Sequence, residues 1–283
     1  MREKGKKLSK KIIIAIVCAV IACVIIFTCG GMQIAFVLAD RIECWHPDYE
    51  KVDLSPILDK AELSDDDYDT LYSQTGLTKV GIDRALKRGK SGKAHILDIQ
   101  NDFFTEHKVK NDLFAPFICT DYLEDYMTHV YVEDGDIVVT TSTHLSGWRM
   151  GHAGLVTDAA MNRVLQASAV GSLSDIGKMQ DFTDRVNFMI LSPKADAETK
   201  AEVVQYAKDY LTGIPYDPTA GVFTNKKHIK KTQCAHIVWY AYKQFGIDLD
   251  SDGGLVVTPK DIANSPYVEL VQVFGLNPNL LWK

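Results

Sequence analysis

The sequence lacks charge over one long segment, because residues 12–39 contain no Asp, Glu, Lys or Arg. Residues 1–11 carry six basic residues and the single acid Glu3. An uncharged, mostly apolar run of this length behind a basic flank is typical of a transmembrane helix whose N-terminal side faces the cytoplasm. We therefore expect a cytoplasmic flank at 1–11, a transmembrane helix at 12–39 and an extracellular domain after it.

A cleaved signal peptide is the competing interpretation of this segment, since residues 37–39 (VLA) place small residues before Asp40. The apolar run is longer than the core of an ordinary signal peptide, which favours an uncleaved anchor. Lipidation of Cys29 is a further alternative, although residues 27–28 (FT) fit poorly before a lipidated cysteine.

Positive charge is scarce in the rest of the chain, where 25 basic residues stand against 36 acidic ones. Nucleic acids and anionic membrane surfaces repel a domain of net negative charge, so we expect no nucleic-acid partner. Cysteine is scarce there too: Cys44, Cys119 and Cys234 are the only three after the apolar segment. An odd count excludes a disulfide framework that uses all of them, and Cys44 with Cys119 is a candidate pair.

The remaining pattern predicts an α+β fold. We expect helices at 65–75, between Ser64 as a cap and Gly76 as a stop, and at 78–88, followed by a helical or irregular segment to 125. β-Branched runs separated by turn residues then predict antiparallel strand pairs, and apolar positions at helical spacing follow. The expected strands are 130–132 with 137–140, 152–157 with 163–167, and 188–191; the expected helices are 201–211, 234–245 and one capped by Thr258.

Three residues carry the predicted chemistry. Cys234 stands at the start of a helix, where the helix dipole favours the thiolate. Among eight histidines, His152 opens a strand between Gly151 and Gly154 and is the best candidate base. On the returning strand, Gln166 is expected to accept the other imidazole N–H and so to orient the ring. Each residue alone also has a structural interpretation, as a buried thiol, a strand histidine and a strand amide.

Two apparent metal motifs are set aside. Residues 248–253 (DLDSDG) match the first half of a calcium loop, but Pro259 occupies the position that needs a bidentate glutamate. Cys234 with His228 and His236 lacks a second ligand pair at zinc spacing. We therefore predict neither a metal nor another cofactor.

Residues 135–172 (GDIVVTTSTHLSGWRMGHAGLVTDAAMNRVLQASAVGS), 214–217 (IPYD) and 233–266 (QCAHIVWYAYKQFGIDLDSDGGLVVTPKDIANSP) resemble circularly permuted papain-fold hydrolases of the NlpC-type superfamily, YiiX-like branch. By this resemblance Cys234 matches the nucleophile, His152 the base and Gln166 the third polar position. Many relatives carry glutamate at the third position, and serine then an acid after the cysteine. This chain instead has Gln166 and, after the cysteine, Ala235-His236.

The resemblance implies a permuted papain-like domain at 126–283, preceded by a linker and helical extension at 40–125. Its implied activity is cysteine-dependent cleavage of amide bonds, with cell-wall peptides as substrates. Trp148, Arg149 and Tyr216 are the candidate substrate-binding residues. A lipid- or acyl-directed thiol hydrolase or acyltransferase is one alternative, and a non-catalytic wall-binding module of the same fold is another.

Overall fold

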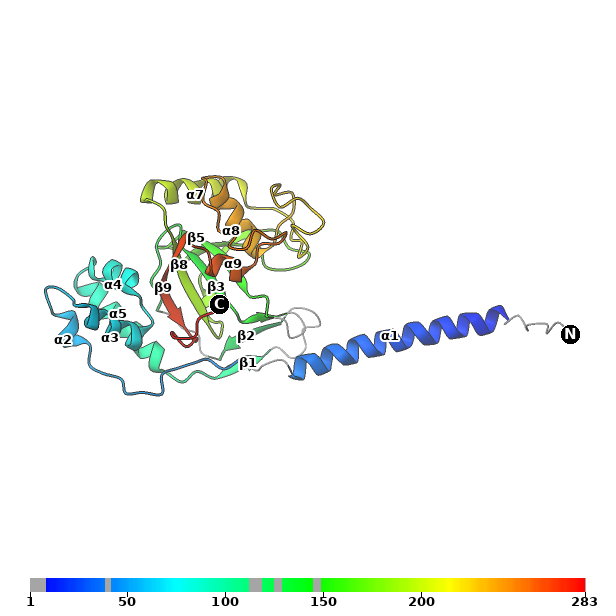
Figure 1. Cartoon of the computed structure of the whole chain (residues 1–283), viewed down its shortest axis with the longest axis horizontal. Helices are drawn as coiled ribbons and strands as arrows, with labels where there is room; N and C mark the ends of the chain where they lie inside the picture. The colour runs from blue at the N-terminus through cyan, green and yellow to red at the C-terminus, as the bar shows by residue number, and fades with distance from the viewer. Residues whose placement is uncertain (1–8, 39–41, 112–118, 125–128, 145–148, 283) are drawn as a thin grey trace.

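The computed structural model describes residues 9–38, 42–111, 119–124, 129–144 and 149–282. Helix α1 (Lys10–Leu38) extends away from the globular body (Figure 1). Its segment Lys10–Thr28 has a mean hydropathy of 2.9, and none of it is buried against the rest of the chain. By length and composition, α1 can therefore cross a membrane, as the uncharged run predicts.

The globular body begins with four helices, which form the helical extension of the chain: α2 (Ser55–Leu58), α3 (Asp65–Thr75), α4 (Lys79–Leu86) and α5 (Lys90–Phe104). Ser64 and Asp67 form a capping box at the start of α3, and Gly76 ends that helix with a positive φ of 70°. These local signals are those that the sequence offered.

Two antiparallel sheets follow (Figure 1). The smaller has the order β1-β2-β4, with β1 (Val109–Asn111), β2 (Cys119–Leu123) and β4 (Thr143–His144). The larger has the order β7-β6-β5-β3-β8-β9, with β3 (Ile137–Thr140), β5 (His152–Asp158), β6 (Arg163–Gln166), β7 (Asp175–Lys178), β8 (Phe188–Pro193) and β9 (Val268–Phe274).

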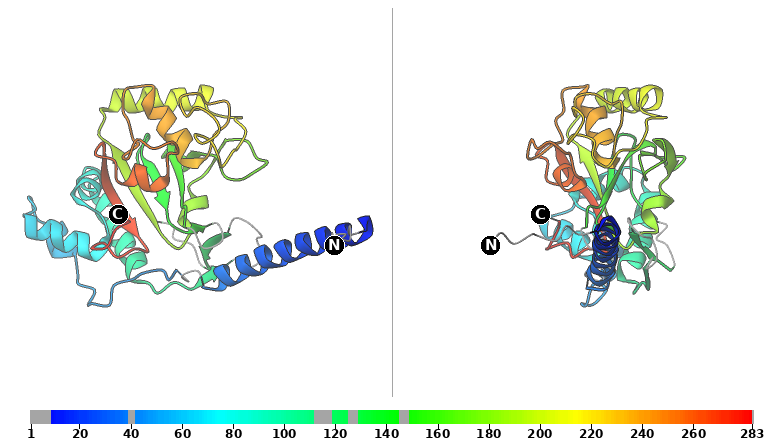
Figure 2. Two further views of the ribbon diagram at one scale, coloured as in Figure 1. Left: turned by 45° about the vertical axis from the view of Figure 1, so that its right-hand side comes forward. Right: turned by 90° about the vertical axis from the view of Figure 1, so that its right-hand side faces the viewer.

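Helices cover both faces of the larger sheet (Figure 2). Successive strand residues point to opposite faces, so Val138 packs toward the helical extension while Ile137 and Val139 pack toward the C-terminal helices. Those C-terminal helices are α7 (Ala197–Tyr210), α8 (Cys234–Lys243) and α9 (Pro259–Ala263); the short α6 (Gln180–Thr183) lies between β7 and β8 in the chain. The fold is therefore α+β in three layers, with α8 against the face of the sheet that carries the candidate site.

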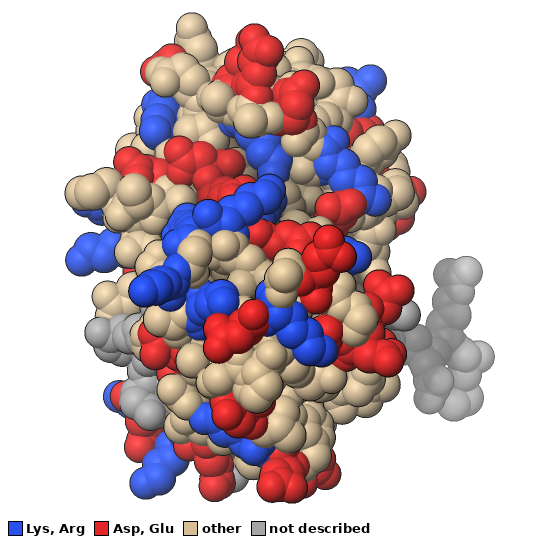
Figure 3. Space-filling model, turned by 90° about the vertical axis from the view of Figure 1, so that its left-hand side faces the viewer, with Lys and Arg blue, Asp and Glu red and all other residues tan. Residues whose placement is uncertain are grey.

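Buried charges connect the helical extension to the sheet. Asp136, just before β3, is fully buried, and it accepts a hydrogen bond from Arg84 of α4 at 2.9 Å. Lys200 of α7 lies 3.7 Å from the other oxygen of Asp136. Figure 3 views the molecule from the side of the helical extension. The exposed basic and acidic side chains lie side by side over this surface.

The structure corrects the expected strand at 130–132. That segment is not in a sheet: the N–H of Tyr131 donates to the side chain of Gln272 at 2.8 Å, and the carbonyl of Val130 accepts from His95 at 3.0 Å. Strand β3 already has β5 on one side and β8 on the other, which leaves no edge for a strand from 130–132. Strands β1, β2, β4, β7 and β9 were not predicted.

Candidate active site

Cys234 is the first residue of α8, and Gln233 caps that helix. The side-chain oxygen of Gln233 accepts the N–H of Ala235 at 2.8 Å and faces the Cys234 sulfur at 3.4 Å. The thiol is thus placed at the helix start as the sequence predicts, and it is 7% exposed. The backbone N–H of Ala153, in β5, also points to the sulfur. The start of α8 and the start of β5 therefore meet at Cys234.

His152 is the first residue of β5 and the immediate neighbour of Ala153. The preceding Gly151 has a φ of 71°, and a Cβ there would lie 2.5 Å from the carbonyl oxygen of Thr140 and 2.6 Å from the Trp282 ring. Only glycine fits this position. The imidazole stacks on the ring of Phe182 with centroids 5.1 Å apart.

The side chain of Gln166 in β6 lies against the His152 imidazole, which is the contact that its predicted orienting role requires. Its amide nitrogen donates to the Asp181 carboxylate at 2.6 Å, and a carboxylate only accepts, so the amide oxygen faces His152. That oxygen lies 3.0 Å from His152 Nε2. Nε2 must therefore carry the proton, which leaves Nδ1 as the basic nitrogen. A Cβ on Gly177 would lie 2.4 Å from the Gln166 amide nitrogen, so this contact also depends on a glycine.

Burial dominates the electrostatics of both reacting groups. Burial first, and then the charge of Arg185, lower the pKa of His152 to about 3, while the hydrogen bond to Gln166 acts in the opposite direction. Burial raises the pKa of the Cys234 thiol, although the N–H groups of Ala153 and Ala235 and the charge of Arg185 lower it. The expectation that the helix start makes Cys234 a ready thiolate is therefore wrong, because desolvation outweighs the helix dipole. At rest the pair is a thiol and a neutral imidazole.

The predicted substrate-binding residues have different surroundings. Tyr216 lies close enough to Cys234 for the thiolate charge to raise the pKa of the phenol, after the larger effect of burial. Arg149 donates to the carboxylate of Asp121 at 2.9 Å, so its charge is neutralised within the protein. The expected substrate contact of Arg149 therefore competes with that ion pair. Trp148 lies outside the described residues.

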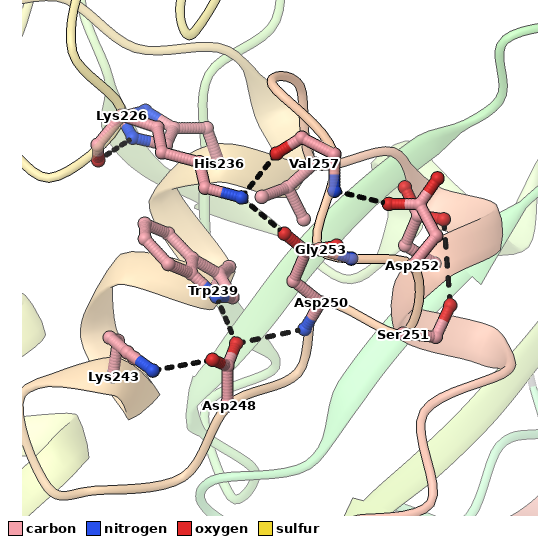
Figure 4. A network of polar contacts seen from close by, with 12 residues as sticks. Lys226, His236, Trp239, Lys243, Asp248, Asp250, Ser251, Asp252, Gly253 and Val257 are labelled. Carbon is pink, nitrogen blue, oxygen red and sulfur yellow. Dashed lines mark hydrogen bonds and ion pairs between the residues drawn. The ribbon is translucent and has the colours of Figure 1, made fainter.

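His236, two residues after the nucleophile candidate, is buried, and both of its ring nitrogens have partners within the protein. Its Nδ1 lies 3.0 Å from the Thr232 hydroxyl and its Nε2 lies 2.7 Å from the carbonyl of Lys226 (Figure 4). His228 is exposed. His236 instead fixes the segment before α8, which Lys226 also holds through its ion pair with Asp250.

The acidic turn after α8 gathers Asp250, Asp252 and Asp261, whose nearest oxygens lie within 4.8 Å of one another. Each carboxylate already has donors from the protein: Lys226 for Asp250, the Gly254 N–H for Asp252 and the N–H and hydroxyl of Thr258 for Asp261. Asp248 likewise accepts from the indole of Trp239 at 2.7 Å (Figure 4). The turn therefore supports α8 and the capping box of α9.

Two residues of the site were missed by sequence reasoning. Asp181 lies in α6 and Arg185 lies just after it, in a segment with no motif spacing to Cys234, His152 or Gln166. Only the packing of α6 beneath the β5–β6 pair brings them to the site. A polar residue 15 positions after Gln166 carries no signal in a single sequence.

The chain shares little sequence with the known proteins to which it was compared. The chain is 25% identical over 136 residues to the Uncharacterized protein YycO of Bacillus subtilis (strain 168), covering 46% of this chain and 52% of that protein. The chain thus spans about half the length of the curated relative that it matches. No known family matches the chain, and no solved structure matches it.

Proposed function

We propose that this protein is a membrane-anchored cysteine hydrolase of the permuted papain type, which cleaves amide bonds in cell-wall peptides. The observation that supports the proposal most is the chain of contacts from Asp181 through Gln166 to His152. This chain leaves Nδ1 of His152 as the basic nitrogen, and the N–H of the next residue, Ala153, points to the Cys234 sulfur.

In the proposed reaction, the Cys234 sulfur attacks the carbonyl carbon of the substrate while its proton passes to Nδ1 of His152. The backbone N–H of Cys234, at the start of α8, is the proposed donor for the oxyanion. His152 then gives its proton to the leaving nitrogen as the C–N bond breaks, and a thioester forms. Water, deprotonated by His152, hydrolyses the thioester and restores the thiol.

Helix α1 supports the proposed location. Its apolar length and the basic residues before it favour a single membrane crossing with the catalytic domain outside the cell. There the substrate is a wall peptide, and neither nucleic acid nor a soluble cofactor is a proposed partner. The same helix also holds the domain beside lipid, which favours the second candidate, a thiol hydrolase or acyltransferase of acyl lipids.

One experiment separates the two candidates. Full-length protein in detergent micelles is incubated with soluble wall peptides and, separately, with acyl lipids, and the products are identified by mass spectrometry. Cleaved wall peptides that disappear with Cys234→Ala support the first candidate; released acyl chains support the second. Intact substrates in both incubations, with a folded wild-type protein, refute the hydrolase proposal.

A further inference from the structure

Arg185 is a buried cation beside the candidate site. It is 8% exposed and follows α6 directly. Its Nε donates to the backbone carbonyl of Asp181 at 2.6 Å, its Nη1 donates to the hydroxyl of Thr143, and its guanidinium carbon lies 5.3 Å from the centre of the Phe182 ring. All three contacts are with groups that carry no formal charge, and Nη2 has no hydrogen-bond partner among the described residues.

The Arg185 guanidinium forms no ion pair with a carboxylate of a described residue. Among the residues that the structure describes, no carboxylate oxygen lies within 4.0 Å of its nitrogens. The Asp181 carboxylate receives the Gln166 amide and the Lys178 N–H instead. Asp184 and Asp181 act on Arg185 electrostatically from beyond ion-pair distance, and burial raises the pKa of Asp184. A buried charge without a partner destabilises a fold by several kcal/mol, so its retention calls for a use.

The groups that face Arg185 identify that use. They come from four parts of the fold: Tyr122 of β2, Asp181 and Asp184 around α6, His152 of β5 and Cys234 of α8. Of these, Cys234 becomes an anion during the proposed reaction, and the pKa of His152 is lowered first by burial and then by the charge of Arg185. Arg185 and His152 also both contact the Phe182 ring.

Arg149 provides the contrast within the same region. Its guanidinium is paired with Asp121 at 2.9 Å, whereas that of Arg185 has no ion pair among the described residues. Nη2 of Arg185 has no hydrogen-bond partner among the described residues, and guanidinium N–H groups are strong donors to carboxylates. Of these two arginines, Arg185 is therefore the one equipped to bind a negative group that arrives with the substrate.

We propose that Arg185 is the anion-binding residue of this active site: it stabilises the Cys234 thiolate and binds a carboxylate that stands next to the scissile bond of the substrate. This inference rests on the proposed function, since it names the substrate class of the same site. It implies a preference for acidic peptides over neutral ones. The same charge stabilises the anion that Cys234 becomes when its proton passes to His152.

Alkylation of Cys234 tests the inference without any hydrolysis. Iodoacetate and iodoacetamide react at the same sulfur, but only iodoacetate carries a carboxylate beside its reactive carbon. The rates of both are measured on the full-length protein in detergent at pH 7, with Cys234 followed by peptide mapping. We expect the iodoacetate-to-iodoacetamide rate ratio to exceed that of N-acetylcysteine by about tenfold, equivalent to one pKa unit of stabilisation.

Variants of Arg185 test whether this residue causes the preference for iodoacetate. In Arg185→Gln, the ratio should fall to that of N-acetylcysteine, and the pH profile of the iodoacetamide reaction should move upward by about one unit. Arg185→Lys keeps the charge and should keep most of the preference. Arg163→Gln removes a charge from the exposed start of β6 and should change neither quantity. Thermal unfolding confirms that each variant is folded.

A wild-type ratio equal to that of N-acetylcysteine would overturn the inference, and so would an unchanged ratio in folded Arg185→Gln. If Arg185→Gln does not fold, the wild-type and Arg185→Lys ratios decide. If the protein prefers iodoacetate but cleaves neither wall peptides nor acyl lipids, this inference stands and the hydrolase proposal is refuted. If the protein cleaves neutral and acidic peptides at equal rates and shows no iodoacetate preference, the hydrolase proposal stands and this inference is refuted.

Discussion

The amide nitrogen of Gln166 donates to the carboxylate of Asp181 at 2.6 Å, and this contact determines which end of the amide faces His152. Asp181 touches neither the imidazole nor the thiol in any described contact, yet it fixes the tautomer of the base through Gln166. Two residues therefore fill the third polar position of the site. The carboxylate of Asp181 orients the neutral amide of Gln166, and that amide in turn orients the imidazole.

This pair predicts the effect of a glutamate at position 166, the residue found there in many of the hydrolases that the sequence resembles. Gln166→Glu replaces the donor nitrogen with an oxygen facing Asp181, so two carboxylates meet and one must bind a proton. We expect kcat to fall by about 10- to 100-fold with little change in KM, because an imidazole held in the wrong tautomer affects turnover rather than binding.

The double variant Gln166→Glu/Asp181→Asn restores a donor opposite the new carboxylate and should recover most of kcat. Gln166→Ala should lower kcat as much as the glutamate variant does, and Asp181→Asn should have no rescuing effect on it. Steady-state kinetics on the cleaved substrate compare the four variants with wild type. Equal kcat values in wild type and Gln166→Ala would remove Gln166 from the site.

The lowered pKa of His152 predicts a pH-dependent stability. The folded protein keeps His152 neutral down to about pH 3, whereas the unfolded chain binds a proton near pH 6.5. Stability from this group is therefore complete above pH 6.5 and is lost as the pH falls from 6.5 toward 3. Between pH 7 and pH 4.5, the free energy of unfolding should drop by about 2 to 3 kcal/mol from this residue alone.

Urea unfolding of wild type and His152→Gln at both pH values isolates this contribution. The loss between pH 7 and 4.5 should be smaller in the variant by about 2 kcal/mol, because glutamine does not titrate. An identical loss in both proteins would mean that His152 is protonated in the folded state at pH 4.5.

The buried ion pair between Arg84 and Asp136 predicts that the helical extension is needed for the stability of the sheet. Arg84→Met leaves the fully buried Asp136 with Lys200, at 3.7 Å, as its remaining described cation, and should lower the free energy of unfolding by about 3 kcal/mol. Lys93→Met breaks the exposed pair with Asp59 and should change it by less than about 1 kcal/mol. Similar losses in the two variants would contradict a special role for the buried pair.

Sequence reasoning was most accurate where the determining signals are local. Ser64 and Gly76 bound α3 because a cap and a stop act within one turn, and the β5–β6 pair follows from two β-branched runs around a short turn. That pair alone brings His152 to Gln166. The start of α8 at Cys234 was likewise readable from its apolar stripe.

Long-range packing determined what the sequence did not reveal. The run at 130–132 has the composition of a strand, but β3 has no free edge to receive it. The pKa of Cys234 depends on how deeply α8 is buried, which outweighs the helix dipole that the sequence suggested. Arg185 and Asp181 reach the site only because α6 packs beneath Gln166 and Phe182 stacks on His152.

The apolar length of α1 predicts that the full-length protein stays with membranes after washing with carbonate at high pH. External protease should cut the domain from intact cells that lack a wall barrier, because the basic flank favours an orientation with the N-terminus in the cytoplasm and the domain outside. A chain without residues 10–38 should appear in the soluble fraction and serves as the control. Protection of the domain in intact cells, with cleavage after lysis, would place it in the cytoplasm.

The most direct test of the account is the detection of a thioester on Cys234. Full-length protein is mixed with wall peptides, quenched in acid within the first turnover and analysed by intact-mass and peptide-mapping mass spectrometry. We expect an added mass equal to the acyl part of the peptide, located on Cys234 and absent in Cys234→Ala, which should also have lost cleavage. Cleavage by folded Cys234→Ala at the wild-type rate, with no adduct on the wild-type thiol, would contradict a nucleophilic Cys234.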